Sequence, residues 1–174
     1  MVLDILRLLL FPTLVAFAAA SDLVTMTISN RVSLLLAAGF IVLALAGGMG
    51  LTQMAWHAAA GIAVLTGAFA LFALGWIGGG DAKLAAATAL WLGFDHLLNY
   101  LLYASLFGGA LTVFIISLRV WPLPAALGSQ AWLQRLHDKT SGIPYGVALA
   151  AAALMVYPNT PWMKAVDLAR LSGG

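Results

Sequence analysis

The stretch "GWIGGGDAKL" (residues 75–84) decides how this chain has to fold. Three consecutive glycines lead into Asp81, and Lys83 follows two positions later, inside a sequence that is otherwise almost wholly apolar. The apolar run that follows, 82–95, is shorter than the roughly 20 residues that a membrane-spanning helix needs. A short helix that opens after glycines is typical of a polar cavity within the membrane thickness, because irregular backbone is tolerated there only where it lines such a cavity.

Composition places the whole chain in the membrane. Of its 174 residues 63% are hydrophobic and only 8% are charged, and the mean hydropathy is +1.03. A soluble domain carries roughly 25% charged residues. The net charge of +2 is spread over few charges, which favours basic loops beside membrane spans over nucleic-acid binding. The absence of cysteine excludes disulfides, thiolate metal sites and a cysteine nucleophile.

Apolar runs between charges and Gly/Pro clusters predict an all-α integral membrane protein with about six transmembrane helices and no soluble domain. The single predicted domain, 1–174, has spans at about 3–20, 32–48, 55–77, 82–95, 97–118 and 142–158. Alternation of these spans puts one group of basic residues on one side of the membrane: Arg31, Lys83, Arg119, Arg135 and Lys139. The other side receives Arg7, Lys164 and Arg170. The positive-inside rule therefore predicts that the first group faces the cytoplasm and that both chain ends face outward.

The chain has six aspartates and no glutamate, so each carboxylate can be weighed separately. Four are predicted to lie in solvated places: Asp4 and Asp167, each with an arginine at i+3 (Arg7 and Arg170), Asp138 in the interfacial segment 119–141, and Asp95 in the turn between the fourth and fifth spans. Asp95 stands next to His96, and an Asp–His pair can do acid–base work. This pair therefore remains an alternative site.

Asp22 and Asp81 differ from the other four. Asp22 ends the first predicted span and Asp81 begins the fourth, so both come to the same side of the membrane. Two carboxylates a few ångströms apart resist double ionisation and hold one proton between them. One can then act as a base toward water while the other polarises a carbonyl, which gives a peptide hydrolase that needs no metal and no cofactor. The alternative is a membrane transporter that uses Asp22 and Asp81 to bind a cation or relay protons.

The neighbours of Asp81 support the hydrolase hypothesis. Without side chains, Gly78 and Gly80 would let an extended substrate backbone approach Asp81, and they tolerate conformations that other residues resist. The alternative is a flexible turn with Asp81 as the N-cap of the next helix. Lys83 is a flexible cation that could meet an acidic group on the substrate, or simply extend to the membrane interface.

Three blocks of the chain resemble the signature blocks of the type IV prepilin peptidases: "SDLVTMTISNRVSLLL" (21–36), "GGGDAKLAAATALWLG" (78–93) and "GIPYGVALA" (142–150). These are Gly-x-Gly-Asp aspartic proteases of the bacterial inner membrane. The resemblance implies that Asp22 and Asp81 are the catalytic aspartates. It also implies supporting roles for Gly78, Gly80, Lys83, Asn30, Pro144 and Tyr145. Where relatives commonly read Ile-Pro-Asn after the first aspartate, this chain reads Ile-Ser-Asn (28–30).

The early position of Asp22 and the lack of cysteine also distinguish this chain from the larger, bifunctional members of that family. Those carry an additional cytoplasmic domain that methylates the new N-terminus, so we expect the short, peptidase-only type that serves tight-adherence (Flp) pili. The resemblance implies prepilin or pseudopilin substrates and cleavage of a short basic leader after a glycine, at the cytoplasmic face. A catalytically silent scaffold for pilus assembly is the remaining alternative. The sequence does not give the oligomeric state.

Overall fold

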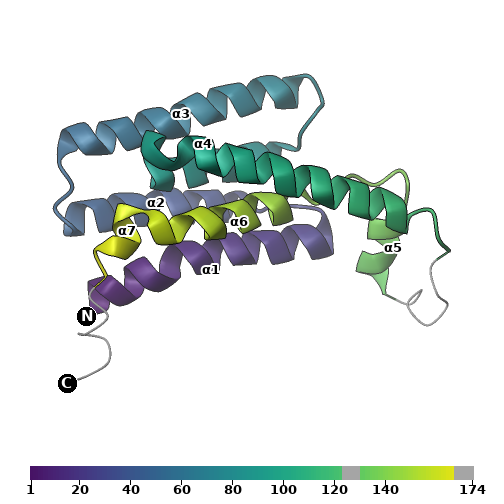
Figure 1. Ribbon diagram of the computed structural model, residues 1–174, viewed down its shortest axis with the longest axis horizontal. Helices are drawn as coiled ribbons and strands as arrows, with labels where there is room; N and C mark the ends of the chain where they lie inside the picture. The colour runs from purple at the N-terminus through teal and green to yellow at the C-terminus, as the bar shows by residue number, and fades with distance from the viewer. Residues whose placement is uncertain (123–129, 167–174) are drawn as a thin grey trace.

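The computed structural model describes residues 1–122 and 130–166, and within these ranges the regular elements are all helical (Figure 1). They are, in chain order, α1 (Val2–Thr25), α2 (Asn30–Ala46), α3 (Leu51–Ala73), α4 (Gly79–Leu118), α5 (Ala131–His137), α6 (Tyr145–Val156), the 3-10 helix η1 (Tyr157–Asn159) and α7 (Pro161–Lys164). The predicted pair of Asp167 and Arg170 lies outside the described residues.

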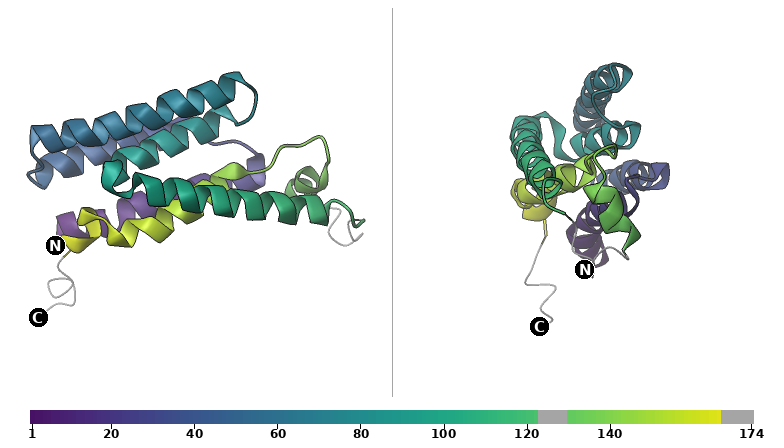
Figure 2. Two further views of the ribbon diagram at one scale, coloured as in Figure 1. Left: turned by 45° about the horizontal axis from the view of Figure 1, so that its top comes forward. Right: turned by 90° about the vertical axis from the view of Figure 1, so that its right-hand side faces the viewer.

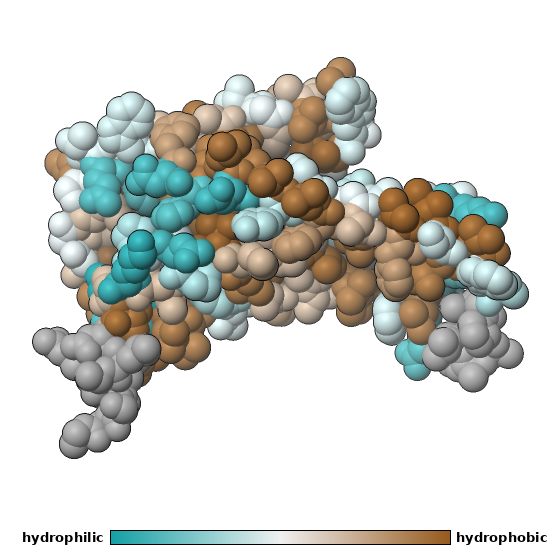
Figure 3. Space-filling model, viewed as in Figure 1, coloured by the Kyte–Doolittle hydropathy of each residue, from teal (hydrophilic) through white to brown (hydrophobic). Residues whose placement is uncertain are grey.

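The helices have the length and surface of membrane helices. α1, α3 and α4 are long and apolar enough to cross a membrane, and α2 and α6 are shorter apolar helices. Large apolar side chains point outward, for example Leu34 at 67% and Leu98 at 78% exposed. On the face seen in Figure 3, hydrophobic residues predominate away from the end where α4 turns back. Such an exterior suits lipid and not water, so the predicted all-α membrane protein is confirmed.

The helices α1, α2, α3 and the first half of α4 run in alternating directions along one bundle, and α4 itself folds back on its length (Figures 1 and 2). We call the end where α1 finishes and α2, α4 and α6 begin the carboxylate end. The N-terminus, the reversal of α4 and α7 lie at the other end, here called the turn end. The predicted basic group that includes Arg31 and Lys83 therefore lies at the carboxylate end. The second half of α4 extends past the bundle there and meets α5, whose Arg135 Nη2 donates to Val24 O at 2.8 Å.

The reversal of α4 takes place at a single glycine. Gly93 has φ 63° and ψ −179°, a backbone conformation that other residues rarely adopt. Breaking a helix leaves carbonyls in its last turn without partners. Here His57 Nδ1 donates to Leu90 O and Trp162 Nε1 donates to Trp91 O, each at 2.8 Å. The predicted fourth and fifth segments thus meet with no loop between them, because side chains from α3 and α7 replace the missing helical hydrogen bonds.

Large rings fill the interior toward the turn end. This aromatic core consists of Phe11, Phe40, Trp91, Tyr157 and Trp162, none more than 5% exposed. Neighbouring ring centroids are 4.5 Å apart for Phe11 and Tyr157 and 5.1 Å apart for Trp91 and Trp162. The polar atoms of the rings are satisfied as well, since Trp91 Nε1 donates to Leu36 O and Tyr157 Oη to Arg7 O. Burial and ring packing of this kind hold α1, α2, α4, η1 and α7 together.

The pairing of Asp4 with Arg7 is confirmed, but its predicted surface position is wrong. Asp4 is only 8% exposed, with Arg7 Nη1 at 3.8 Å from Oδ1 and the N-terminal amine at 2.9 Å from Oδ2. The end of α2 closes over this pair: a Cβ on Gly47 would stand 2.6 Å from Arg7 Nη2. The approach of α2, which the local spacing of charges does not reveal, buries the pair.

Candidate active site

Asp22 lies in the last turn of α1, because this helix continues beyond the predicted end at residue 20 to Thr25. The side chain is buried, at 5% exposure, and its Oδ2 accepts a hydrogen bond of 2.8 Å from Gly146 N. Gly146 is in the first turn of α6, where backbone N–H groups have no partner within the helix. The positive end of the α6 dipole also favours a carboxylate there. Asp22 therefore fixes the start of α6 against the end of α1.

Gly146 permits this contact because it has no side chain. A Cβ at this position would stand 2.8 Å from Asp22 Oδ2 and 2.7 Å from Ile28 Cδ1. Any other residue would displace Asp22, Ile28 or α6 itself. The contact thus depends on bare backbone in the block that opens α6.

Asp81 lies in the first turn of α4, three residues after the N-cap Gly78. Its carboxylate accepts a hydrogen bond from the backbone N–H of Gly78. This is the reciprocal half of a capping box, in which an acidic side chain at the third helical position reaches back to the N-cap. Asp81 is therefore not the N-cap of α4, as the alternative reading had it. Gly78 is held bare by the same contact, since a Cβ there would stand 2.8 Å from Asp81 Oδ2.

The two carboxylates come together at the carboxylate end. Asp22 is close enough to Asp81 for their charges to interact. Asp81 Oδ1 is buried, and among the described residues it has no hydrogen-bond partner. An unsatisfied buried acceptor is costly, and in folded proteins it commonly marks a catalytic atom or a bound water. Geometry thus leaves one carboxylate oxygen available for chemistry beside a second carboxylate.

Ile28, in the α1–α2 connection, lies between Gly146 and Gly80. It contacts Gly146 on one side and Gly80 on the other, where a Cβ would stand 3.1 Å from Ile28 Cβ and 3.4 Å from Ile28 N. Gly80 therefore makes room for the chain's own loop. Gly80 does not use the conformational freedom that the sequence analysis considered: among the described residues, the glycines with positive φ are Gly48, Gly75 and Gly93.

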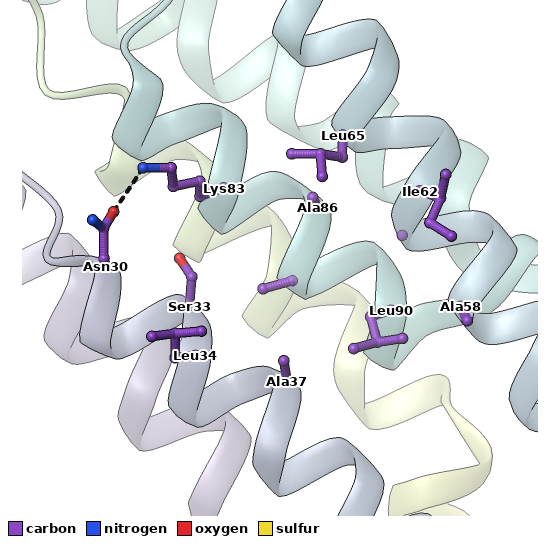
Figure 4. A pocket seen from close by; sticks show the side chains of 12 residues that line it. Asn30, Ser33, Leu34, Ala37, Ala58, Ile62, Leu65, Lys83, Ala86 and Leu90 are labelled. Atoms are coloured by element: carbon purple, nitrogen blue, oxygen red, sulfur yellow. Dashed lines mark hydrogen bonds between the residues drawn. The ribbon is translucent and has the colours of Figure 1, made fainter.

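Lys83 turns away from Asp81, as expected for positions i and i+2 on a helix. Its Nζ donates to Asn30 Oδ1 at 2.8 Å, which links the second turn of α4 to the first turn of α2 (Figure 4). Asn30, which the sequence resemblance singled out, thus holds the lysine and not a carboxylate.

The model of the type IV leader peptidase family matches residues 9–113, a range that contains both Asp22 and Asp81. The chain belongs to this family. No curated protein and no solved structure matches it. The resemblance seen in the sequence is confirmed, and with it a peptidase activity of the leader-peptidase kind, while the transporter alternative has no support.

Pro144 and Tyr145 lie at the start of α6, directly before Gly146, in this leader peptidase. Pro144 is buried as the N-cap of α6. The Tyr145 hydroxyl is 3.0 Å from Thr112 Oγ1, and its ring lies where a Cβ on Gly108 would be 3.4 Å away. Tyr145 therefore positions α6 against the second half of α4.

Sequence reasoning missed two buried hydroxyls near Asp81. Tyr100, which is fully buried, lies beside the Thr88 hydroxyl and close enough to Asp81 to interact electrostatically. Thr88 is seven residues after Asp81, on the same face of the helix, which was the available signal. The sequence gave no signal for Tyr100, because this residue stands inside an apolar run.

Asp95 and His96 lie just beyond Gly93, at the turn end of the bundle, whereas Asp22 and Asp81 lie at the carboxylate end. Asp95 is exposed and borders a cavity that it shares with His57. The structure therefore does not bring this alternative pair to the aspartates of the candidate site.

Proposed function

We propose that this leader peptidase removes the short basic leader of type IV or Flp-type prepilins after a glycine, at the cytoplasmic face of the bacterial inner membrane, with Asp22 and Asp81 as its catalytic residues. The observation that carries the proposal is the buried Oδ1 of Asp81, which lies beside Asp22 and has no hydrogen-bond partner in the part of the chain that the structure describes. Cleavage of a peptide bond by two carboxylates requires such an oxygen.

In the proposed reaction the pair holds one proton between its two carboxylates. The ionised carboxylate removes a proton from a water molecule, whose oxygen attacks the carbonyl carbon of the scissile bond. The protonated carboxyl donates to the carbonyl oxygen as negative charge develops there. Collapse of the tetrahedral intermediate breaks the C–N bond, and the proton taken from water passes to the leaving amine. No metal or cofactor enters the sequence of steps.

The cytoplasmic location rests on charge. The helix ends at the carboxylate end carry Arg31, Lys83 and Arg119, and α5 there carries Arg135, whereas Arg7 and Lys164 lie toward the turn end. Because the chain has no cysteine, Ser29→Cys gives a single thiol in the α1–α2 connection. In intact cells an impermeant thiol reagent added from outside should leave this thiol unlabelled until the membrane is opened. Labelling before opening would reverse the proposed orientation.

The activity is tested with the purified chain in phospholipid vesicles and a prepilin that carries a basic leader. Mass spectrometry of the product should show a single cut directly after the glycine that ends the leader. Asp81→Asn, inserted to the same level, should give no product. A wild-type protein that leaves the prepilin intact, or that cuts elsewhere, would contradict the proposed substrate.

A further inference from the structure

A polar cavity of about 600 Å³ lies at the turn end, where α3 begins and α4 reverses. On the face seen in Figure 3, hydrophilic residues gather over this reversal. The volume lies within the range of small-molecule sites, about 300–1,000 Å³. The lining residues are Thr52, Gln53, Trp56 and His57 from α3, and Gly93, Phe94 and Asp95 from α4. We call this the reversal cavity.

The reversal cavity has a negative charge without a counter-ion. Asp95 is exposed on its border and makes no hydrogen bond or ion pair with any other residue that the structure describes. Neither lysine nor arginine is among the described residues that line the cavity. A cleft lined by one sign of charge attracts the opposite sign, so this cavity favours a cation.

Hydrogen-bond acceptors share the lining with this carboxylate. His57 is only 9% exposed, and its Nδ1 donates to Leu90 O at 2.8 Å, so the neutral ring accepts through Nε2. Gly93 packs against the ring and holds its orientation, since a Cβ there would stand 3.0 Å from His57 Cε1. The hydroxyl of Thr52 and the amide oxygen of Gln53 are further acceptors. The cavity therefore suits a ligand that donates several hydrogen bonds.

Two aromatic rings complete the lining. The ring centroids of Trp56 and Phe94 are 5.9 Å apart, with an interplanar angle of 77°. The two side chains are 63% and 45% exposed, so their faces are open to a ligand. Such faces attract cations electrostatically. In the part of the chain that the structure describes, no three His, Cys, Asp or Glu side chains are grouped to hold a metal ion. The lining thus suits an organic cation.

We infer that the reversal cavity binds a primary ammonium group, whose charge pairs with Asp95 and whose carbon chain lies against Trp56 and Phe94. A primary ammonium has one positive charge and three N–H donors, which matches one carboxylate beside several acceptors on α3. The cavity lies at the opposite end of the bundle from Asp22 and Asp81, so the inference does not depend on the proposed function.

Two kinds of molecule carry this group. An ethanolamine phospholipid presents it at the membrane surface, where tryptophans such as Trp56 are enriched. A soluble amine presents it without acyl chains. The ammonium ion is common to both, and titration with each source distinguishes them.

Native mass spectrometry of the purified protein in detergent micelles, titrated with one lipid at a time, tests the site. Dioleoyl phosphatidylethanolamine should bind at least about tenfold more tightly than the phosphatidylglycerol with the same chains, which has no ammonium group. Phosphatidylcholine, whose ammonium group has no N–H, should bind more weakly than phosphatidylethanolamine. Equal affinity for phosphatidylethanolamine and phosphatidylglycerol would overturn the site. Equal affinity for phosphatidylcholine would overturn the assignment of a primary ammonium.

Two matched pairs of substitutions locate the binding. Asp95→Asn should weaken the binding of phosphatidylethanolamine at least about tenfold, because the acceptor loses its charge. Asp138→Asn, at an exposed carboxylate outside the cavity, should not. Trp56→Leu should weaken the binding about two- to fivefold, whereas Trp76→Leu, beyond the other end of α3, should not. Unchanged binding by Asp95→Asn, with the circular dichroism of wild type, would contradict the inference.

The source of the ammonium group is identified with O-phosphoethanolamine, which carries the headgroup without acyl chains. If it displaces the phospholipid from wild type and does not bind to Asp95→Asn, the site takes a soluble amine. Binding of the phospholipid alone, which is the result we expect at a membrane surface, assigns the site to the lipid. A wild-type protein that binds neither molecule would overturn the inference, whatever its activity on prepilin.

Discussion

The two ends of the bundle differ in how their helices make contact, although the first half of α4 runs from one end to the other. At the turn end, the aromatic core is close-packed and the ring N–H and O–H groups of Trp91, Tyr157 and Trp162 donate to backbone carbonyls. At the carboxylate end, contacts are made by glycine backbone, and Asp81 Oδ1 has no partner among the described residues. One end supplies aromatic packing, and the other retains an unsatisfied carboxylate oxygen beside a second carboxylate.

This difference shows how a small membrane protein can hold a reactive pair in place. Asp81 and Trp91 both lie in the first half of α4, before Gly93. This half is anchored by the hydrogen bond from Trp91 Nε1 to Leu36 O. Alanines between them are buried and let α4 pack closely against its neighbours. Packing a few turns away therefore offsets the destabilisation that the unsatisfied oxygen causes, as is expected of functional sites. Changes at the two ends should separate stability from catalysis.

The largest expected effect is on stability, from Trp91→Ala. This substitution removes a fully buried ring and the donor to Leu36 O, so it should lower the free energy of unfolding by about 3–5 kcal/mol. The measurement is reversible unfolding in detergent micelles. Trp76→Ala, at a side chain 71% exposed, is the control and should cost less than about 0.5 kcal/mol. Well below its unfolding temperature, Trp91→Ala should still cleave prepilin. Loss of cleavage without loss of stability would contradict the claim that the turn end contributes to stability and not to catalysis.

The next effect should fall on catalysis alone, from Gly80→Val. The new side chain would meet Ile28 near 3.1 Å and displace the loop that covers Asp22 and Asp81. A misplacement of about 1 Å costs roughly a hundredfold in rate, so kcat/KM should fall at least that far while the helices remain assembled. Gly79→Ala is the matched control, because a Cβ there has only ordinary contact with the Phe72 ring, at 3.4 Å. Normal cleavage by a well-inserted Gly80→Val protein would show that the glycine serves only the turn.

A smaller loss is expected for Lys83→Met. Methionine keeps the apolar stem but removes the cation and its bond to Asn30, so prepilin cleavage should fall by about tenfold to a hundredfold. Circular dichroism and membrane insertion should not change. Kinetics equal to wild type would mean that Lys83 merely extends to the membrane interface.

The smallest effect should come from Asp138→Asn. The N–H and hydroxyl of Thr140 donate to this carboxylate and hold its pKa below the usual range, so Asp138 is already ionised at neutral pH. Asp138 becomes protonated only at more acidic pH. It therefore cannot produce a limb of the pH–rate profile near neutrality. Asp138→Asn should therefore keep both the rate and the shape of that profile. A shift of either limb of the pH–rate profile would show that Asp138 takes part in the mechanism.

The sequence was sufficient for the features that depend on composition and on isolated polar residues. A chain so poor in charge had to be a helical membrane protein, and Asp22 and Asp81 stood out because carboxylates are rare in apolar runs. Alternation of predicted spans also placed them at one end of the bundle.

Features that depend on close approach between distant segments could not be predicted. Gly93 resembles any glycine in an apolar run, and its role becomes visible only when His57 and Trp162 supply donors from α3 and α7. Likewise, Gly146 and Gly80 had no assigned contact until Ile28 was found between them. Periodicity reports which face of a helix is buried but not which backbone atoms meet.

The central claim is that Asp22 and Asp81 act as one unit, and the most direct measurement is a double-mutant cycle on prepilin cleavage. Asn preserves the size of Asp and removes only the ionisable group, so Asp22→Asn and Asp81→Asn should each abolish the cut at equal levels of inserted protein. The double variant should be no worse than either single one, because residues that share a proton are non-additive in their effects. Wild type should show a bell-shaped pH profile that belongs to the pair. Cleavage by folded, inserted Asp22→Asn, or losses that add in the double variant, would contradict the account.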